Sequence, residues 1–477
     1  ADPVMKMPGV VRVIETPRGI AVVARSYWEA LKGRDALDVT WDESKAEKRG
    51  TTALMASYRE RAEKGGGARV HAEGDTAAAL DGADKVVEAD FEFPYLAHAA
   101  MEPLNAVGIL RNGRLEIWAG HQMPDYYQAV AADILGIQPD QVTLHVMMTG
   151  GFFGRRATPD ADVIVETASL VKALGEDVPI RVQWTREDDT TGGRYRPMYF
   201  HRVRAGLDGD GKLAAWDHHI VGQSILRGTV FEADMVRNGI DATSVEGVEE
   251  MPYAIPNQSV SLSTMDAGVP VLWWRSVGHT HTAFAIETVI DDLARAAGSD
   301  PVAFRRQLMG DHPRHLGVME LAAEKAGWAR PPRKGLHRGI AVHASFGSYV
   351  AEVAEVSLGD DGGWKVERVV CAVDCGIAVN PDIIRAQMEG GIGFALAAIV
   401  HGEITMTDGI VDQDNYDSFQ VLRINEMPSV EVYIVDSAES PTGVGEPGVP
   451  PLGPAVSNAL MAATGTRQRV LPLGTRV

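Results

Sequence analysis

Four short turn sequences between β-type runs constrain the fold most strongly. Asn112-Gly113 divides GILR from RLEIW, and the turns DGDG (208–211), DDGG (360–363) and DG (408–409) divide similar runs. An Asn-Gly or Asp-Gly pair between alternating runs is the strongest short signal for an antiparallel hairpin, because both residues tolerate positive φ. DGDGK also resembles the start of a calcium loop, but the later ligands and the final Glu are missing, which favours a hairpin.

Apolar residues at helical spacing predict helices between these hairpins, over residues 123–136, 158–175, 281–298, 301–310 and 450–465. In the second of these helices, Thr158 is the expected N-cap, Pro159 the first helical residue and Gly175 the stop. The chain opens with two β-type runs, VVRVI and IAVVA, and a helix that begins at SYWEALKG. The polar, Gly-rich stretch 58–76 is expected to be an exposed loop or linker. The elements together predict an α+β chain.

The length of the chain, 477 residues, is enough for about two to four domains. We expect a partial α/β domain over residues 1–80 and two blocks of comparable make-up over 85–310 and 311–477. Residues 1–33 lack an initiator Met and the apolar region of a signal peptide, and they read as the middle of a domain. We therefore expect a processed product or one subunit of something larger.

Composition argues against some functions. The formal net charge is −20, so the surface would repel nucleic acid and anionic membranes. The apolar run 394–400 is far too short to span a bilayer. Cys371 and Cys375 cannot by themselves hold an iron–sulfur cluster or a four-thiolate zinc ion. They read as small buried residues on a strand and the turn after it, with a disulfide as the alternative and the redox compartment undecided.

The segment TGGFFGRR (149–156) joins a β-type run, VTLHVMM, to the helix predicted after Thr158. A strand, a Gly-rich loop and a helix in this order is the arrangement in which backbone N–H groups and the helix dipole converge on an anion. The patterns GxxxxGK[ST] and GxGxxG are both absent from the loop. An anion site and a tight packing turn are therefore equally good interpretations.

A second unusual loop is SPTGVGEPGVPPLGPA (440–455), in which Glu446 is the only charged residue. A lone carboxylate in a rigid, apolar loop should lose part of its hydration, which suits a general base. An exposed glutamate is the ordinary alternative.

Other segments also combine polar residues with tight turns. His279 and His281 form an H-x-H pair, but two histidines without a third nearby favour packing over metal binding, and neither HExxH nor GxSxG occurs. The segments are 98–107 with Glu102, 119–124 with His121 and Gln122, 273–284 with Arg275, and 373–396 with Gln387 before a Gly-rich run.

Together these segments resemble the molybdenum-binding large subunit of the xanthine oxidase family, most closely its branch of isoquinoline 1-oxidoreductase β-subunits. The resemblance covers nearly the whole chain. In order, it is carried by the MEP turn (101–103), Gln122, the GGxFGRR loop, WRSVGHTH, the CGIAVNP…Q.EGG segment and GVGEPGVPP. The family fold that it implies has two elongated mixed α/β molybdopterin-binding domains, preceded here by part of an α/β hammerhead-like domain.

The resemblance also implies a molybdopterin cofactor, usually the cytosine dinucleotide in bacteria, in a crevice between the two domains and without a direct metal ligand from the protein. It implies a hydroxylase that takes oxygen from water and oxidises an N-heteroaromatic compound or an aldehyde. Glu446 matches the family's catalytic glutamate. The residues expected to contact the cofactor are Gln122, Gly150, Gly151, Phe152, Phe153, Gly154, Arg155, Arg275, Ser276, Gln387, Gly390 and Gly391.

Phe152 departs from the branch pattern GGGFGRR, because it stands where the third glycine lets the backbone approach the cofactor. Either the loop shifts, or the cofactor is bound differently, or it is absent. Two alternatives therefore stay open: a relative without molybdenum that is a hydrolase in the same cleft, and a non-catalytic scaffold subunit.

The family's EMGQG-type segment is missing from the sequence, and in the isoquinoline branch it lies nearer the N-terminus than the present first residue. We therefore expect a second polypeptide that carries this portion. The resemblance also implies a small subunit with a [2Fe–2S] cluster and, in some members, a cytochrome. Many branch members carry a twin-arginine export signal, which favours the bacterial periplasm over the cytoplasm.

Overall fold

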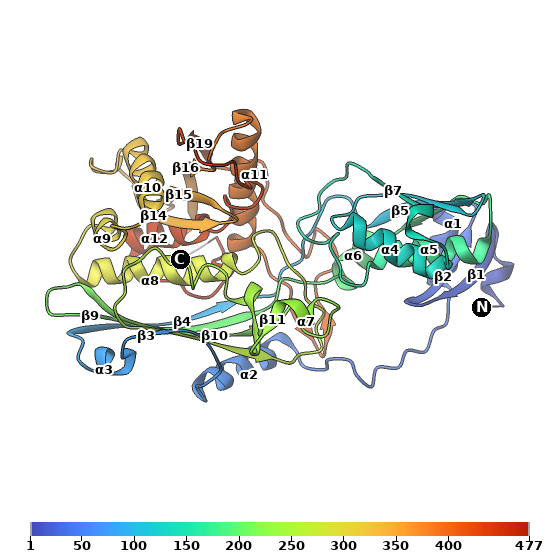
Figure 1. The fold of residues 1–477 in the computed structure, drawn as a ribbon, viewed down its shortest axis with the longest axis horizontal. Coiled ribbons are helices and arrows are strands. Elements are labelled where there is room, and N and C mark those ends of the chain that lie inside the picture. Colours follow the sequence, from blue (N-terminus) through green and yellow to red (C-terminus); the bar gives the residue numbers. More distant parts are fainter. Residues whose placement is uncertain (1, 476–477) are drawn as a thin grey trace. The chain divides into compact units, whose positions relative to one another are not determined.

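The computed structural model describes residues 2–475, and the chain divides into two compact units (Figure 1). Unit 1 contains the residues up to Glu47 together with His98–Arg194 and Gly268–Trp274. Unit 2 contains Lys48–Ala97, Tyr195–Ala267 and the residues from Arg275 onward. Neither unit is a continuous stretch of chain, so each depends on contacts between segments that are distant in the sequence.

Unit 1 is built on a four-stranded sheet with the strand order β7-β6-β5-β8. Strands β6 and β7 are parallel and are joined through α4, whereas the other neighbours are antiparallel. Helices α4 and α5 pack together and against the sheet. The elements are β5 (Asn105–Arg111), β6 (Arg114–Ala119), α4 (Pro124–Leu135), η2 (Pro139–Gln141), β7 (Val142–Val146), α5 (Asp162–Leu174), β8 (Ile180–Gln183) and α6 (Arg186–Thr191).

The core of unit 1 lies between this sheet and its two helices. A Cβ at Gly108 would lie 2.6 Å from the Thr167 side chain, so glycine at this position lets α5 approach β5 closely. A two-stranded sheet and a helix complete the unit, with α5 in contact with β1. They comprise η1 (Val4–Lys6), β1 (Val10–Thr16), β2 (Gly19–Ala24) and α1 (Tyr27–Asp35).

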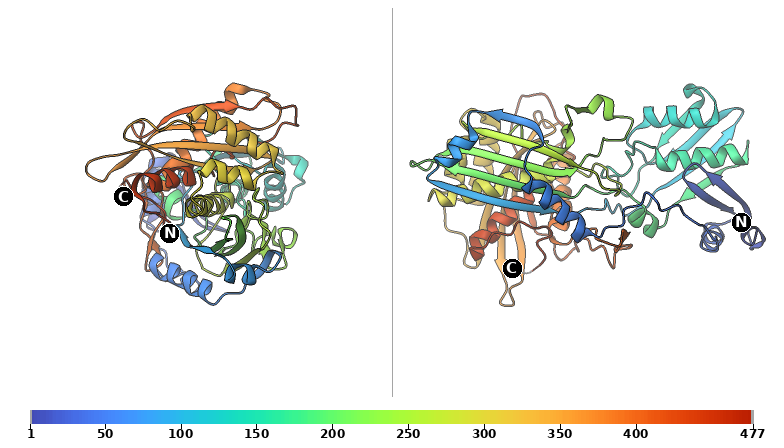
Figure 2. Two further views of the ribbon diagram at one scale, coloured as in Figure 1. Left: turned by 90° about the vertical axis from the view of Figure 1, so that its left-hand side faces the viewer. Right: turned by 90° about the horizontal axis from the view of Figure 1, so that it is seen from below.

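Unit 2 contains two larger sheets, ordered β3-β13-β10-β9-β4 and β14-β15-β16-β19. Helices α2 and α3 cover one face of the first sheet and α8 covers the other, whereas α12 and α10 lie on opposite faces of the second sheet (Figures 1 and 2). The strands are β3 (Ala68–Glu73), β4 (Lys85–Phe93), β9 (Tyr199–Leu207), β10 (Leu213–Gln223), β13 (Gln258–Met265), β14 (Leu336–Ser345), β15 (Ser348–Leu358), β16 (Trp364–Asp374) and β19 (Ser429–Ile434).

Helix α8 (His279–Ala296) joins the two sheets of unit 2, because it contacts β4 and β9 of the first sheet and also α12 and β14. Its Phe284 is buried with its ring edge-on to Phe91 and Phe93 of β4, at centroid distances of 6.1 and 5.8 Å. The other helices and short strands are α2 (Thr51–Glu63), α3 (Thr76–Asp81), α7 (Glu232–Met235), β11 (Val236–Arg237), β12 (Ile240–Asp241), η3 (Ala242–Ser244), α9 (Pro301–Leu308), α10 (Pro313–Ala326), α11 (Pro381–Val400), β17 (Met406–Thr407), β18 (Ile410–Val411) and α12 (Leu452–Thr464).

Helix α11 is the one helix in the described part of the chain whose length and composition would allow it to cross a membrane. It contacts α12 and β19, and 44% of its most apolar window is buried within the protein. A core helix meets the same two criteria, so this finding is weak evidence for a membrane span.

All four predicted hairpins are confirmed. The turns join β5 to β6, β9 to β10, β15 to β16 and β17 to β18, each pair antiparallel. The two cysteines are free and buried, as expected, with Cys371 in β16 and Cys375 just after it. Asp300 caps α9 by accepting hydrogen bonds from the N–H groups of Val302 and Ala303.

Two local predictions are wrong. The stretch 58–76 is not a loop, because Tyr58 is fully buried in α2 and residues 68–73 form β3 of the first sheet. Helix α5 begins at Asp162 and not after Thr158, because Ala161 adopts a left-handed conformation with φ of 49° that interrupts the helix. The Thr158 hydroxyl still accepts a hydrogen bond from the Asp162 N–H, at 3.2 Å.

We expect Phe284→Ala to destabilise unit 2 by about 3–5 kcal/mol, because it leaves a cavity at the contact between α8 and the first sheet. Chemical denaturation followed by circular dichroism measures the change. Val230→Ala, at a side chain that is 62% exposed, is the control and should change stability little. Equal effects of the two substitutions would contradict the central position of α8.

Candidate active site

The residues that the sequence predicted for the site fall into two groups, one in each unit. Gln122 and the loop 150–155 belong to unit 1. The second group belongs to unit 2 and consists of Arg275, Ser276, Gln387, Gly390, Gly391 and Glu446.

In unit 1, the Gly-rich loop is anchored by the two arginines that follow it. Arg155, only 3% exposed, donates to Asp162 at 2.7 Å and lies 3.4 Å from Asp189. Arg156 donates to the backbone carbonyls of Gly120 and Glu102, at 3.3 and 3.2 Å. A buried guanidinium is costly unless it is paired, so these partners fix the end of the loop.

The first N–H group of the loop already has an anionic partner. The Gly150 N–H donates to one carboxylate oxygen of Glu102 at 2.8 Å, and the Asn105 side chain donates to the other at 2.6 Å. Burial acts to raise the pKa of Glu102, but these hydrogen bonds and the Arg156 charge outweigh it and lower the pKa. An internal carboxylate therefore takes part of the anion-binding capacity that the sequence indicated.

The glycines of the loop are required by its conformation. Gly151 has φ of +114°, and a Cβ there would lie 2.6 Å from the ring of Phe153. Gly154 has φ of +101°, and a Cβ there would lie 2.3 Å from the Trp273 carbonyl oxygen. Phe153 itself is left-handed, with φ of 51°, which is costly for an aromatic residue and is found where surrounding structure imposes it.

Phe152 packs within unit 1. Its ring lies 2.9 Å from the position that a Cβ on Gly120 would take, and the Arg156 guanidinium stacks over it at 5.9 Å from the ring centroid. The absence of a side chain at Gly120 therefore makes room for the aromatic ring that replaces the family's third glycine.

The turn after β6 presents two polar side chains beside this loop. Gln122 is exposed, and its N–H donates to the Arg156 carbonyl at 2.9 Å. His121 is 4% exposed, and both of its ring nitrogens lack a hydrogen-bond partner among the described residues. Burial, with the Arg156 charge, lowers the pKa of His121. An unsatisfied buried imidazole next to an exposed amide is what a site for a polar cofactor would offer.

In unit 2, Arg275 connects the Glu446 loop to helix α11. Its Nε donates to the Gly445 carbonyl at 2.7 Å, and its Nη2 donates to the side-chain oxygen of Gln387 at 3.2 Å. Its guanidinium also lies 5.7 Å from the ring centroid of Phe394. Burial lowers the pKa of Arg275, although the Glu446 charge opposes this effect.

Ser276 holds Glu446 through two hydrogen bonds. The Ser276 N–H donates to Oε1 of Glu446 at 2.8 Å, and the Ser276 hydroxyl donates to the Glu446 carbonyl at 2.7 Å. Ser276 and Val277 have φ of 77° and 45°, so two consecutive residues other than glycine are left-handed. Such strain persists only where surrounding contacts impose it, which marks this turn as a functional candidate.

Gln387, Gly390 and Gly391 lie inside α11, whereas the sequence placed them in a loop region. A Cβ at Gly391 would lie 3.1 Å from the backbone of Gly448, so this glycine lets α11 approach the Glu446 loop. Gly390 is exposed with no atom near its Cβ position, and nothing in the structure explains a glycine there.

Sequence reasoning missed Glu246, whose Oε2 accepts a hydrogen bond from the Gly278 N–H at 3.0 Å. Burial raises the pKa of Glu246 to about 8, against the effect of the Gly278 N–H and with a contribution from the Glu446 charge. Glu246 lies in SVEGVEEM, where three glutamates in five residues resemble a solvated surface. The glycine that follows Glu246 was the only local signal of a tight turn.

The H-x-H pair belongs to the packed interior. His279 Nδ1 lies 2.8 Å from His343 Nε2, and His281 Nδ1 lies 2.9 Å from His201 Nε2. Within residues 2–475, no group of three His, Cys, Asp or Glu side chains is arranged to hold a metal ion. The packing interpretation of the pair therefore agrees with the structure.

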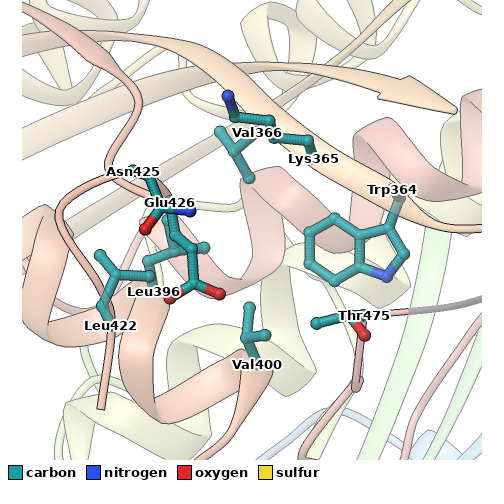
Figure 3. A pocket seen from close by; sticks show the side chains of 9 residues that line it. All are labelled: Trp364, Lys365, Val366, Leu396, Val400, Leu422, Asn425, Glu426 and Thr475. Atoms are coloured by element: carbon teal, nitrogen blue, oxygen red, sulfur yellow. The ribbon is translucent and has the colours of Figure 1, made fainter. Parts of the chain in front are cut away.

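A cavity of about 290 Å³ in unit 2 lies away from these residues, and Figure 3 shows its lining. None of the predicted site residues contributes to it. Its walls are formed by Trp364, Lys365, Val366, Leu396, Val400, Leu422, Asn425, Glu426 and Thr475.

Comparison with known families accounts for both groups of residues. Residues 61–309 and 290–428 match models of the molybdopterin cofactor-binding domain. The chain belongs to the xanthine oxidase family of molybdenum-binding subunits. The predicted family is therefore confirmed, and the two matched regions together include every predicted site residue except Glu446.

Two curated relatives are similar along nearly the whole chain. Over 98% of its length it is 31% identical to the beta subunit of isoquinoline 1-oxidoreductase from Brevundimonas diminuta and 27% identical to a nicotinate dehydrogenase subunit from Pseudomonas putida. The chain spans 61% of the first relative and 41% of the second.

A solved structure shows the same fold. Quinoline 2-oxidoreductase from Pseudomonas putida 86 aligns with a TM-score of 0.82 at 16% identity, over 99% of this chain and 90% of that chain. This likeness confirms the expected α+β molybdopterin-binding fold.

We expect Gly151→Ala to destabilise unit 1 by about 1–3 kcal/mol, because a side chain is strained at this backbone conformation and would collide with Phe153. Thermal unfolding measures the loss. Gly317→Ala in α10 is the control, since it meets open space in a helix and should be neutral or stabilising. A loop that accepts Ala at 151 without loss would show that its glycine is not sterically required.

Proposed function

We propose that the chain is the molybdenum-binding part of a hydroxylase that oxidises an N-heteroaromatic compound or an aldehyde with water as the oxygen source. The observation that carries the proposal is the fixed position of Glu446, held by both groups of Ser276 in a strained turn. This geometry occurs in a chain of the molybdenum-binding family whose relatives are named as oxidoreductases of N-heteroaromatic compounds.

Residues of both groups are proposed to bind the cofactor. In unit 1 these are Gln122, which is exposed, and the loop Gly150–Arg155, whose backbone is open at Gly151 and Gly154. In unit 2 they are Arg275, Ser276, Gln387, Gly390 and Gly391, with Arg275 as a cation suited to a phosphate group. The cytosine dinucleotide form of molybdopterin is part of the proposal.

Glu446 is proposed to act as the general base. When bound, the cofactor supplies a molybdenum centre that activates the incoming oxygen and accepts the two electrons of the oxidation. The Glu446 carboxylate takes the proton that water loses, and Ser276 keeps that carboxylate in place. Because Oε1 already accepts the Ser276 N–H, Oε2 is the oxygen that we assign to proton transfer.

A relative without molybdenum is the less favoured alternative. Phe152 raised it, but the ring packs over Gly120 and beneath Arg156 in unit 1. The relatives' names also favour oxidoreductase chemistry over a hydrolase or a scaffold.

Further polypeptides are part of the proposal. The chain spans 61% of its isoquinoline relative, and that relative and the nicotinate relative are both named as subunits. We therefore propose a second polypeptide that supplies the remaining portion, an iron–sulfur subunit that receives the electrons, and in some arrangements a cytochrome. A periplasmic location stays a prediction from the sequence.

The direct test is purification of the complete complex from its source, followed by analysis of molybdenum, pterin and released cytidine nucleotide. We expect about one molybdenum per chain, oxidation of N-heteroaromatic compounds or aldehydes, and incorporation of labelled oxygen from water. Absence of molybdenum together with ester or amide hydrolysis would overturn the proposal in favour of the hydrolase. Absence of both activities would favour the scaffold.

We expect Glu446→Gln to keep the cofactor but to lower kcat by roughly 10²-fold or more, because a positioned general base contributes at least this much. Molybdenum analysis and steady-state kinetics on the purified complex check the two parts. Glu439→Gln, an exposed glutamate in the same region, is the matched control and should keep normal turnover. Near-full activity of Glu446→Gln would exclude its role as the base.

A further inference from the structure

Two glutamates are held by the turn that leads into α8. The Ser276 N–H donates to Glu446, and two residues later the Gly278 N–H donates to Oε2 of Glu246 at 3.0 Å. The residues between these donors include the left-handed Ser276 and Val277. Neighbouring N–H groups in turns that contain left-handed residues form concave sites for anionic groups. One short segment of unit 2 therefore gathers two carboxyl groups from chain positions 200 residues apart.

The backbone on either side of the Glu246 carboxyl is fixed as well. The Thr282 hydroxyl of α8 donates to the Glu246 carbonyl at 2.7 Å. Gly247 has φ of +82°, and a Cβ there would lie 2.6 Å from the His343 ring and 2.9 Å from Nδ1 of His279. The turn 246–247 is thus packed directly on a pair of imidazoles, and only glycine fits at its second position.

This pair of imidazoles is continuous with Glu246. His279 Nδ1 lies 2.8 Å from His343 Nε2, which is a hydrogen bond between the two rings. The other nitrogen of His279, Nε2, lies 4.0 Å from Oε2 of Glu246. The Glu246 side chain is 27% exposed, so rotation about its bonds can shorten this distance to that of a hydrogen bond.

The electrostatic surroundings keep a proton on Glu246 at neutral pH. Burial is the main cause of its raised pKa of about 8, and the charges of Glu446, Asp241 and Glu250 act in the same direction. The neighbouring imidazoles are neutral, because burial lowers the pKa of His279 to about 4 and that of His343 still further. A neutral imidazole can accept a proton at one nitrogen while it donates one at the other.

We propose that Glu246, His279 and His343 form a proton relay that discharges Glu446 after each turnover. Glu446 becomes protonated when it acts as the base and must lose that proton before the next cycle. It passes the proton to Glu246, while Glu246 releases its own proton to His279 Nε2 and His279 releases one from Nδ1 to His343. One proton enters and one leaves, and no electron moves. The relay rests on the proposed role of Glu446, whereas the protonated state of Glu246 does not.

The kinetic test compares Glu246→Gln with Glu250→Gln in the complete cofactor-loaded complex. Glutamine can still accept the Gly278 N–H, but it cannot exchange a proton. We expect Glu246→Gln to lower kcat by about tenfold or more with little change in KM, and to remove an alkaline limb near pH 8 from the kcat profile. Glu250→Gln removes an exposed charge from the same segment and should retain the wild-type profile. Wild-type kcat and pH profile in Glu246→Gln would overturn the relay.

His343→Gln separates a relay from an isolated acid. We expect it to lower kcat as Glu246→Gln does, while the molybdenum content and KM stay close to those of the wild type. Unchanged kcat in His343→Gln would remove the histidines from the proposal.

A readout that does not depend on activity is the infrared C=O stretch of a protonated carboxylic acid. Subtraction of the Glu246→Gln spectrum from the wild-type spectrum should reveal one such band, which disappears as the pH rises through about 8. Subtraction of the Glu250→Gln spectrum should not reveal it. If the complex lacks molybdenum but shows the band, the proposed function fails and the protonated Glu246 stands. If an active complex lacks the band, the relay alone is overturned.

Discussion

The hydrogen bonds between Ser276 and Glu446 are the interactions on which the rest of the candidate site depends. The loop before α12 has no regular secondary structure over residues 440–448, so its position must come from contacts outside itself. Ser276 supplies two of these contacts and Arg275 supplies a third. The left-handed conformation of Ser276 and Val277 costs energy, and these hydrogen bonds offset that cost. The strain is therefore part of how the carboxylate is positioned.

The Gly-rich loop of unit 1 follows the same principle with different chemistry. Buried arginines hold its C-terminal end, Glu102 holds its first N–H, and a left-handed Phe153 bends the backbone between them. Glycine is required at 151 and 154 because neighbouring atoms occupy the space of a side chain. The sequence motif of this loop thus records steric constraints of unit 1 as well as any contact with a ligand.

Local chemistry made much of the fold predictable, and distant contacts explain what was missed. The Asn-Gly and Asp-Gly turns specify hairpins by themselves, so these predictions were correct. Helix α2 was missed because its apolar residues gain their burial from β9 and β10, more than a hundred residues away. The resemblance identified Glu446 and its neighbours, whereas Glu246 meets the same turn only through the fold, and its local sequence looks like solvated surface.

A pair of carboxyl groups on one turn is useful only if the two differ in protonation. Equal environments would leave both carboxylates charged and repelling each other at neutral pH. Here burial and the Glu446 charge act together on Glu246, so Glu246 keeps its proton in conditions where an exposed glutamate would lose it. The hydrogen bond from Gly278 opposes this effect without cancelling it. The turn 276–278 therefore holds one carboxyl suited to accept a proton and one suited to carry it away, and the difference between them comes from burial and charge because the residue type is the same.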